Sequence, residues 1–137
     1  MAAITPVVGS PFPQRVALRS AATGTTTDWL DVPAFCTAVK VHLRITVAGT
    51  NTILTIKEAN PVARDDGAGN VITVVTSATI TATGYHTYFL YPDATTVADA
   101  AAANTAVQAA VSVPRLIGIT TTPTGSTYTT EIEFLKV

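Results

Sequence analysis

The chain of 137 residues is long enough for one domain with its own core. Charged residues make up only 12%, about half of the usual share, whereas threonine and alanine number 26 and 22. The eight basic residues are scattered and the net charge is −1, which excludes the basic stripe that nucleic-acid binding requires. No apolar run reaches the roughly 18–20 residues of a membrane helix, and the first residues lack the pattern of a signal peptide. The single cysteine, Cys36, has no partner for an intrachain disulfide, which is typical of folding in a reducing cytoplasm.

Threonine suits the pleated, half-buried surface of a strand and disfavours helices. A surface that carries hydroxyl groups in place of charges reduces repulsion between copies of a protein and favours association. The composition therefore predicts a β-rich structural subunit that packs against neighbouring proteins.

Residues 1–28 are predicted to form an extended N-terminal arm. Pro6, Pro11 and Pro13 lack backbone N–H donors and hold the residues before them in extended geometry. We expect this arm to lie along a partner or a neighbouring copy. Phe12 and the three prolines are the first set of interface candidates.

Residues 29–137 are predicted to form a β-sandwich body. Alternation of apolar and polar residues, with turn signals every 8–12 residues, predicts short strands. One strand is predicted in the arm, at residues 15–20. The strands predicted in the body cover residues 39–47, 52–58, 71–75, 77–83, 85–91, 116–121 and 127–134. We expect 39–47 to form a hairpin with 52–58, and 116–121 to form one with 127–134. The series predicts an all-β chain, an antiparallel β-sandwich or jelly roll of about seven to eight strands.

The same alternation assigns side chains to faces. The polar face of the strand at 39–47 holds Lys40, His42 and Arg44, and in the last strand Ile132 and Phe134 point inward. Residues 94–110 are rich in alanine and have two interpretations, a short helix or a long surface excursion.

No enzyme motif is present: the sequence lacks a G-x-S-x-G elbow, a P-loop, an H-E-x-x-H pair and a C-x-x-C pair. We therefore expect no enzyme, and no catalytic, cofactor-binding or metal-binding residues. Asp65, Asp66 and Asn70 match part of a calcium loop, but the twelfth position, where such a loop needs glutamate, is Thr76. A glycine-rich turn explains them better.

Two other sets of polar residues have structural interpretations. Glu131 and Glu133 share one face of the last strand and are expected to pair with the basic face of the strand at 39–47. His42 is expected to be exposed. His86 is expected to be packed, with an interface as the alternative.

The strand at 85–91 is aromatic. Alternation places Tyr85, Phe89 and Tyr91 on one face and Tyr88 on the other. Such residues serve core packing, a subunit interface or a sugar-binding platform. Tyr85, Tyr88 and Tyr91 are the second set of interface candidates.

Several segments together resemble small virion proteins of tailed bacteriophages, encoded among head and tail genes. They are the proline-rich start, "TTTDWLDVPAF" at 25–35, "VKVHLRITVAGTNTILTIKEA" at 39–59 and "RLIGITTTPTGSTYTTEIEFLKV" at 115–137. The resemblance lies in composition and strand architecture over the whole chain, so it carries no individual functional residues.

The resemblance implies a capsid decoration, or cement, protein that stabilises the head by bridging major capsid subunits. Such proteins are often homotrimers, and their place is the virion, which is assembled in the host cytoplasm. The implied partners are the major capsid protein or other virion proteins, with no nucleic acid and no membrane. Two alternatives stay open: a tail, baseplate, fibre or head–tail connector component, and a carbohydrate-binding or adhesion module.

Overall fold

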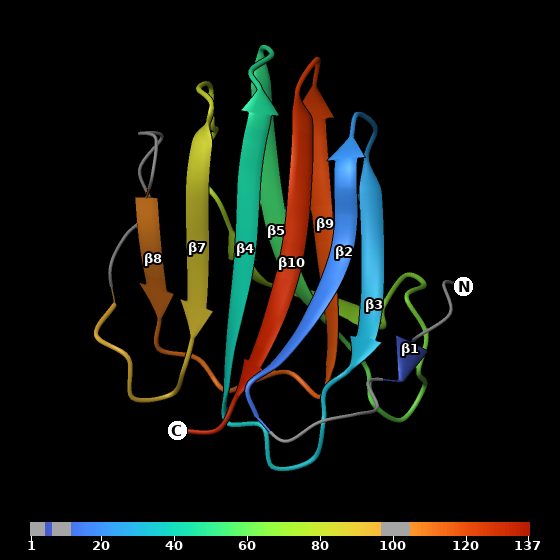
Figure 1. Ribbon diagram of the computed structural model, residues 1–137. Helices are drawn as coiled ribbons and strands as arrows, with labels where there is room; N and C mark the ends of the chain where they lie inside the picture. The colour runs from blue at the N-terminus through green and yellow to red at the C-terminus, as the bar shows by residue number, and fades with distance from the viewer. Residues whose placement is uncertain (1–4, 7–11, 97–104) are drawn as a thin grey trace.

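The computed structural model describes residues 5–6, 12–96 and 105–137, which form a sandwich of two packed β-sheets (Figure 1). The strands in this part of the chain are β1 (Thr5–Pro6), β2 (Gln14–Ala22), β3 (Thr26–Asp31), β4 (Ala38–Val47), β5 (Asn51–Ala59), β6 (Val71–Thr76), β7 (Gly84–Leu90), β8 (Thr105–Ala109), β9 (Leu116–Thr124) and β10 (Thr127–Leu135). Sheet A has the order β1-β3-β9-β5-β6, and sheet B has the order β2-β10-β4-β7-β8. Within the described ranges, no helix is long and apolar enough to cross a membrane.

Eight of these strands pair with one another only in antiparallel fashion. They divide into β2-β10-β4-β7 in one sheet and β3-β9-β5-β6 in the other, which is the strand order of a jelly roll. The two short strands β1 and β8 add to β3 and β7 in parallel fashion. The predicted all-β sandwich is confirmed, and its eight-stranded part matches the predicted number of strands.

Both predicted hairpins are wrong. β4 and β5 follow each other closely in sequence but lie in opposite sheets, and so do β9 and β10. Each pair turns an apolar face toward the other across the core, which a short turn permits as readily as side-by-side pairing. The two turns meet at one end of the sandwich, where Thr50 donates its backbone N–H to the carbonyl oxygen of Thr124 at 2.8 Å. A side chain at Gly49 would place its Cβ 2.3 Å from that same oxygen, so glycine is required there.

The range predicted as an arm, residues 1–28, contains β2 and the first half of β3. β2 pairs with β10 along its length, and its Val16 and Leu18 pack against the core. β3 pairs with β9 from Thr26 onward. The eight antiparallel strands thus begin at Gln14, because this edge of the core needs the apolar face of β2 to cover it.

Two other segments differ from the secondary structure that the sequence predicts. Residues 105–109 form strand β8 on the edge of β7, so a helix through that part of 94–110 is wrong; residues 97–104 lie outside the described part of the chain. The open edge of β7 offers backbone hydrogen bonds that outweigh the helix propensity of alanine. In place of a strand at 77–83 there is one isolated bridge, between Ile80 and Thr52.

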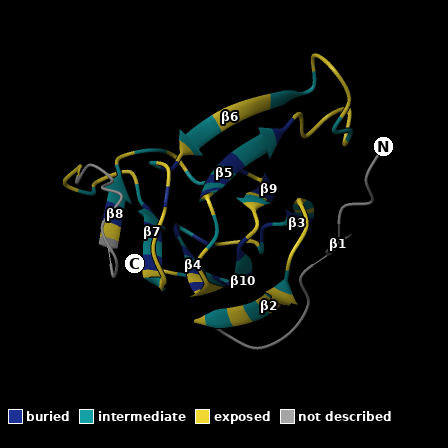
Figure 2. Cartoon of the chain, turned by 90° about the horizontal axis from the view of Figure 1, so that it is seen from above, coloured by how far each residue is buried: buried dark blue, intermediate teal, exposed yellow. Residues whose placement is uncertain are grey.

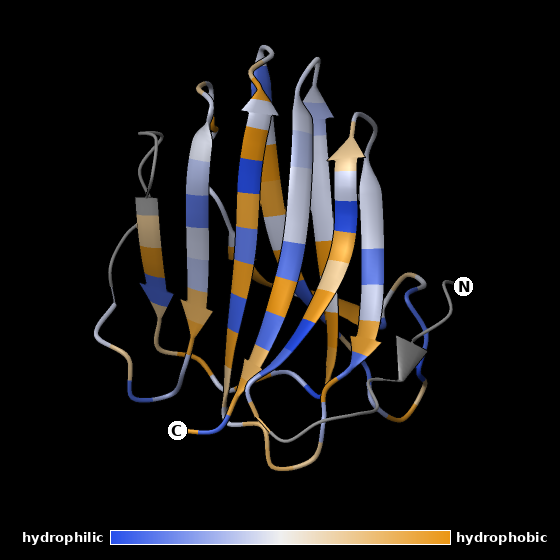
Figure 3. Ribbon diagram, in the orientation of Figure 1, coloured by the Kyte–Doolittle hydropathy of each residue, from blue (hydrophilic) through white to orange (hydrophobic). Residues whose placement is uncertain are grey.

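The core lies between the two sheets, where the strands turn their buried residues toward each other (Figure 2). β4 shows the alternation most plainly, with hydrophobic and hydrophilic bands succeeding each other along the strand (Figure 3). In β10 the side chains of Tyr128, Ile132 and Phe134 are fully buried, which confirms the inward face predicted for this strand.

A second, smaller cluster lies on the outer side of sheet A. Trp29 packs there with Ala59 and Leu116. It stands opposite Gly118 of the neighbouring strand, and the indole ring covers that glycine closely. The absence of a side chain at Gly118 makes the space in which the ring is buried.

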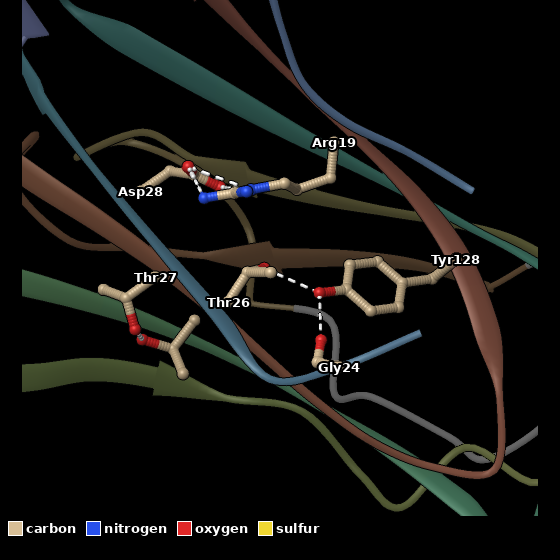
Figure 4. A network of polar contacts seen from close by, with 7 residues as sticks. Arg19, Gly24, Thr26, Thr27, Asp28 and Tyr128 are labelled. Carbon is tan, nitrogen blue, oxygen red and sulfur yellow. Dashed lines mark hydrogen bonds and ion pairs between the residues drawn. The ribbon is translucent and has the colours of Figure 1, made fainter. Parts of the chain in front are cut away.

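A polar network ties the turn between β2 and β3 to β10 (Figure 4). The hydroxyl of Tyr128 donates to the carbonyl oxygen of Gly24 at 2.7 Å and accepts a hydrogen bond from Thr26 at 2.6 Å. Burial raises the pKa of this phenol, so it remains a donor. Beside it, Arg19 donates from Nε and Nη2 to Asp28 at 3.1 and 2.8 Å, and this pairing raises the pKa of the guanidinium. The network joins the two sheets at one edge of the sandwich.

Candidate functional site

The outer face of sheet B carries most of the polar and aromatic side chains singled out above. Three neighbouring strands contribute to it in register, so each residue of β4 lies between one of β10 and one of β7. The three cross-strand rows are Glu133–Lys40–Phe89, Glu131–His42–Thr87 and Thr129–Arg44–Tyr85. We call these nine residues the outer face.

The two glutamates of the outer face pair with β2 as well as with β4. Arg15 Nε lies 2.8 Å from Glu131 Oε1 and 3.4 Å from Glu133 Oε2. Glu133 Oε1 lies 3.8 Å from Nε2 of His42. Of the basic face of β4, His42 lies nearest to these carboxylates, but among the described residues the ion pairs of a permanent cation with Glu131 and Glu133 are made by Arg15 of β2. The contribution of Arg15 could not be predicted from the sequence, because Arg15 reaches the two glutamates only through the pairing of β2 with β10.

His42 is held on two sides. Nδ1 shares a hydrogen bond with the hydroxyl of Tyr85, and the two rings stack with centroids 5.8 Å apart and planes 12° apart. Nε2 faces Glu133 without a hydrogen bond in the described part of the chain. The side chain is largely covered, so the exposed position expected for His42 is wrong.

Burial lowers the pKa of His42 below its ordinary value of about 6.5; Glu133 and Glu131 act in the opposite direction, while Arg15 and Lys40 add to the lowering. The folded protein thus binds a proton at this site less readily than the unfolded chain. The contribution of His42 to the free energy of unfolding is complete at pH values above the ordinary histidine pKa. It is lost as the pH falls through the lowered pKa of the folded protein.

We therefore expect the free energy of unfolding to fall between pH 7.5 and 5, and His42→Gln to reduce the size of that fall. Denaturant unfolding of the native chain and of the His42→Gln variant at several pH values measures the fall in each protein. The difference between the two curves isolates His42 from the carboxylates and from His86. Parallel curves would contradict a neutral His42 in the fold.

The outer face is hollowed on both sides of one cross-strand pair. A hollow of about 270 Å³ lies toward β10 and is lined by Arg15, His42, Arg44, Tyr85, Thr129, Thr130 and Glu131. A second hollow, of about 560 Å³, lies toward the start of β7 and is lined by Arg44, Ile45, Thr46, Thr83, Gly84 and Tyr85. Arg44 and Tyr85 form the wall that the two hollows share.

The other end of the outer face is aromatic and more closely packed. Phe89 and Tyr91 stack with centroids 5.7 Å apart, and Nζ of Lys40 lies 5.5 Å from the centre of the Phe89 ring. This cation–π contact occupies Lys40. The predicted alternation of the aromatic strand is confirmed, since Tyr85 and Phe89 point outward while Tyr88 points inward.

The interface candidates fall into different environments. Tyr85 is 46% exposed and lies on the outer face, and Tyr91 is partly exposed. Tyr88 is fully buried, so it presents no surface to a partner. His86 is also buried, as its packed interpretation predicts, and does not face an interface.

The N-terminal interface candidates lie near the edges of the sheets. Phe12 packs against the core, and a cis peptide bond joins it to Pro13 just before β2. Pro6 lies in β1, an edge strand that tolerates proline. Pro11 lies outside the described residues.

The calcium-like sequence forms a turn. Asp65 accepts the backbone N–H of Gly67 through Oδ1 at 2.7 Å, and Asn70 donates its backbone N–H to the carbonyl oxygen of Gly67. Within the ranges that the structure describes, no group of three or more histidine, cysteine, aspartate or glutamate side chains could hold a metal ion.

Comparison of the chain with protein-family models, with curated proteins and with solved structures finds no match. Inferences about function therefore rest on the residues of this chain and on their geometry.

Proposed function

We propose that this chain is a structural subunit of a bacteriophage virion, a capsid decoration protein that bridges major capsid subunits. The support comes from the jelly-roll sandwich, from the uncharged edges of its sheets and from the resemblance in composition. Jelly rolls build viral capsid proteins and lectins alike, so the fold alone does not choose between them.

The uncharged edges carry the proposal. On the side away from β1 and β2, sheet A ends on β6 and sheet B ends on β8. Neither strand contains a charged residue, and residues 71–92 contain no aspartate, glutamate, lysine or arginine. β6 is largely uncovered (Figure 2), and its Ile72 is 62% exposed. Its pairing with β5 contains one register shift, between Ile56 and Lys57.

Proteins that stay monomeric usually protect such edges with lysine, proline or a covering segment. An open, β-branched, uncharged edge is a template for pairing with another chain. We infer that the edge at β6 is covered by a neighbouring subunit in the assembled state. The low overall charge fits this role, because it removes the repulsion that would oppose close packing.

The opposite edge of sheet A shows how a neighbour can be joined. Thr5 and Pro6 run parallel to Leu30 and Asp31 and extend that sheet by a short strand. An N-terminal segment that adds to a sheet edge within one chain has the geometry needed to add to an edge in another chain.

A lysine on the open edge should disrupt the assembly. We expect the purified chain to form a trimer, with a mass near three times 14.2 kDa by light scattering on a sizing column. Ile72→Lys should reduce this to the monomer mass without loss of the fold, because position 72 is exposed. Thr122→Lys adds the same charge at an exposed position of the central strand β9 and should leave the trimer intact. A monomeric native chain, or a trimer that Ile72→Lys leaves unchanged, would contradict the role assigned to β6.

A further inference from the structure

We propose that Arg44 and Tyr85 form a binding site for a saccharide that carries a carboxylate group. This site lies on the outer face of sheet B and is separate from the edge that we assign to assembly. It adds a ligand-binding activity to a structural subunit.

The position of the pair defines the site. Arg44 and Tyr85 stand opposite each other on β4 and β7 and separate hollows of about 270 and 560 Å³. The smaller hollow is near the lower limit of small-ligand pockets, roughly 300 Å³. A ligand of one or two sugar rings can therefore lie across the pair with a part in each hollow.

Among the described residues of the outer face and of the neighbouring β2, one arginine is available to a ligand. Arg15 is occupied by Glu131 and Glu133, and Lys40 lies over the ring of Phe89. Arg44 is exposed and has no ion-pair or hydrogen-bond partner in the part of the chain that the structure describes. A guanidinium binds a carboxylate through two parallel hydrogen bonds, and this geometry favours carboxylate over a neutral group.

The aromatic partner is fixed in advance. The hydroxyl of Tyr85 is bonded to His42 and its ring is stacked on the imidazole, so little side-chain freedom is lost when a ligand binds. Almost half of the Tyr85 side chain remains exposed. The C–H face of a sugar ring packs on such an aromatic surface.

The remaining lining residues suit sugar hydroxyl groups. The hydroxyl of Thr129 accepts the backbone N–H of Ala21 at 3.2 Å and keeps its own proton to donate. The hydroxyl of Thr46 donates to the carbonyl oxygen of Thr127 at 3.3 Å and can still accept. Glu131 offers a further acceptor. The same glutamate, with Glu133 beside it, repels a polymer with closely spaced negative charges. The site therefore favours a sugar with one carboxylate at the Arg44 end over a nucleic acid or a highly sulfated chain.

The test uses the full chain and defined oligosaccharides. Titration with cellobiouronate, a disaccharide with one carboxylate, is monitored by calorimetry and by NMR shifts of the β4 and β7 amides and should show binding, whereas the matched neutral disaccharide cellobiose should bind roughly tenfold more weakly or worse. Arg44→Gln should reduce the affinity for cellobiouronate by roughly tenfold or more and abolish the preference over cellobiose. Tyr85→Ala should weaken both sugars.

Three controls make the result specific. Arg115→Gln removes the same charge at an exposed arginine outside both hollows and should leave binding unchanged. Light scattering should show the native mass for every variant, which separates this site from the assembly edge. Dextran sulfate should bind more weakly than cellobiouronate.

Several outcomes would overturn the proposal. They are equal binding of the two disaccharides, an equal effect of Arg44→Gln and Arg115→Gln, tighter binding of dextran sulfate, and no binding of any saccharide. If Arg44→Gln weakens attachment to virion proteins while no saccharide binds, the outer face is a protein-docking surface instead.

Discussion

Replacement of Phe134 by alanine is expected to lower the free energy of unfolding by about 3–5 kcal/mol. Phe134 is fully buried on β10, which occupies the position between β2 and β4 in sheet B. The backbone of β10 is paired with β2 on one side and with β4 on the other, so it cannot shift to fill the space that the ring leaves. The variant loses both the transfer free energy of the ring and the packing around the cavity.

Urea unfolding followed by the fluorescence of Trp29, the single tryptophan, measures this loss. Val47→Ala is the matched control, because Val47 is 54% exposed at the end of β4 and should change stability by less than about 0.5 kcal/mol. A cost of under about 1 kcal/mol for Phe134→Ala would contradict the inward face of β10.

The second large effect is expected at Gly118. An alanine there should destabilise the fold by about 1–3 kcal/mol through overpacking, because its Cβ would lie 2.5 Å from Cζ3 of Trp29. The indole is buried against Ala59 and Leu116, so it cannot move aside without losing that packing. In an ordinary strand the same change is favourable, since alanine loses less backbone freedom than glycine on folding.

A double-mutant cycle isolates this contact. Trp29→Leu shortens the side chain, so adding Gly118→Ala to it should cost less than Gly118→Ala costs in the native chain. Gly24→Ala is the control, because a Cβ at Gly24 would meet no atom within 4 Å, and we expect a change within about 0.5 kcal/mol. Strictly additive costs at Trp29 and Gly118 would show that the ring does not lie against the glycine.

The sequence predicts faces well and partners poorly. Alternation of side chains correctly assigns the buried face of β10 and the outward face of β4, because the period of two follows directly from strand geometry. The same alternation is blind to which strand lies alongside. A turn as short as the one at Gly49 joins two strands equally well within a sheet or across the core, which is why the predicted hairpins are wrong.

For the candidate site, too, the sequence predicts the faces on which residues lie but not which strands are neighbours. His42 and the glutamates of β10 could be placed on a polar face from the sequence, and Tyr85 on the face that it shares with Phe89 and Tyr91. Their assembly into one face depends on long-range register, such as Glu131 beside His42, which no local pattern encodes. Arg15 joins them through the pairing of β2 with β10, so it is found only once that pairing is known.

Which strands lie at the edges of the sheets can be learned only from the topology. The sequence shows that residues 71–92 lack charge, but only the strand order shows that β6 forms the end of a sheet. Charge-free sequence in a central strand is ordinary, whereas at an edge it indicates a partner. The same contrast distinguishes the buried Tyr88 from the exposed Tyr85, three residues apart on β7.

Immunogold electron microscopy most directly tests the claim that this chain decorates a phage head. The experiment requires a phage whose genome carries this sequence; its virions are purified, labelled with an antibody against the folded protein, and compared with virions from which the gene has been deleted. We expect gold particles over the whole surface of the head and none on the deleted particles. Label confined to the tail or baseplate, or no label on intact virions, would contradict the decoration function.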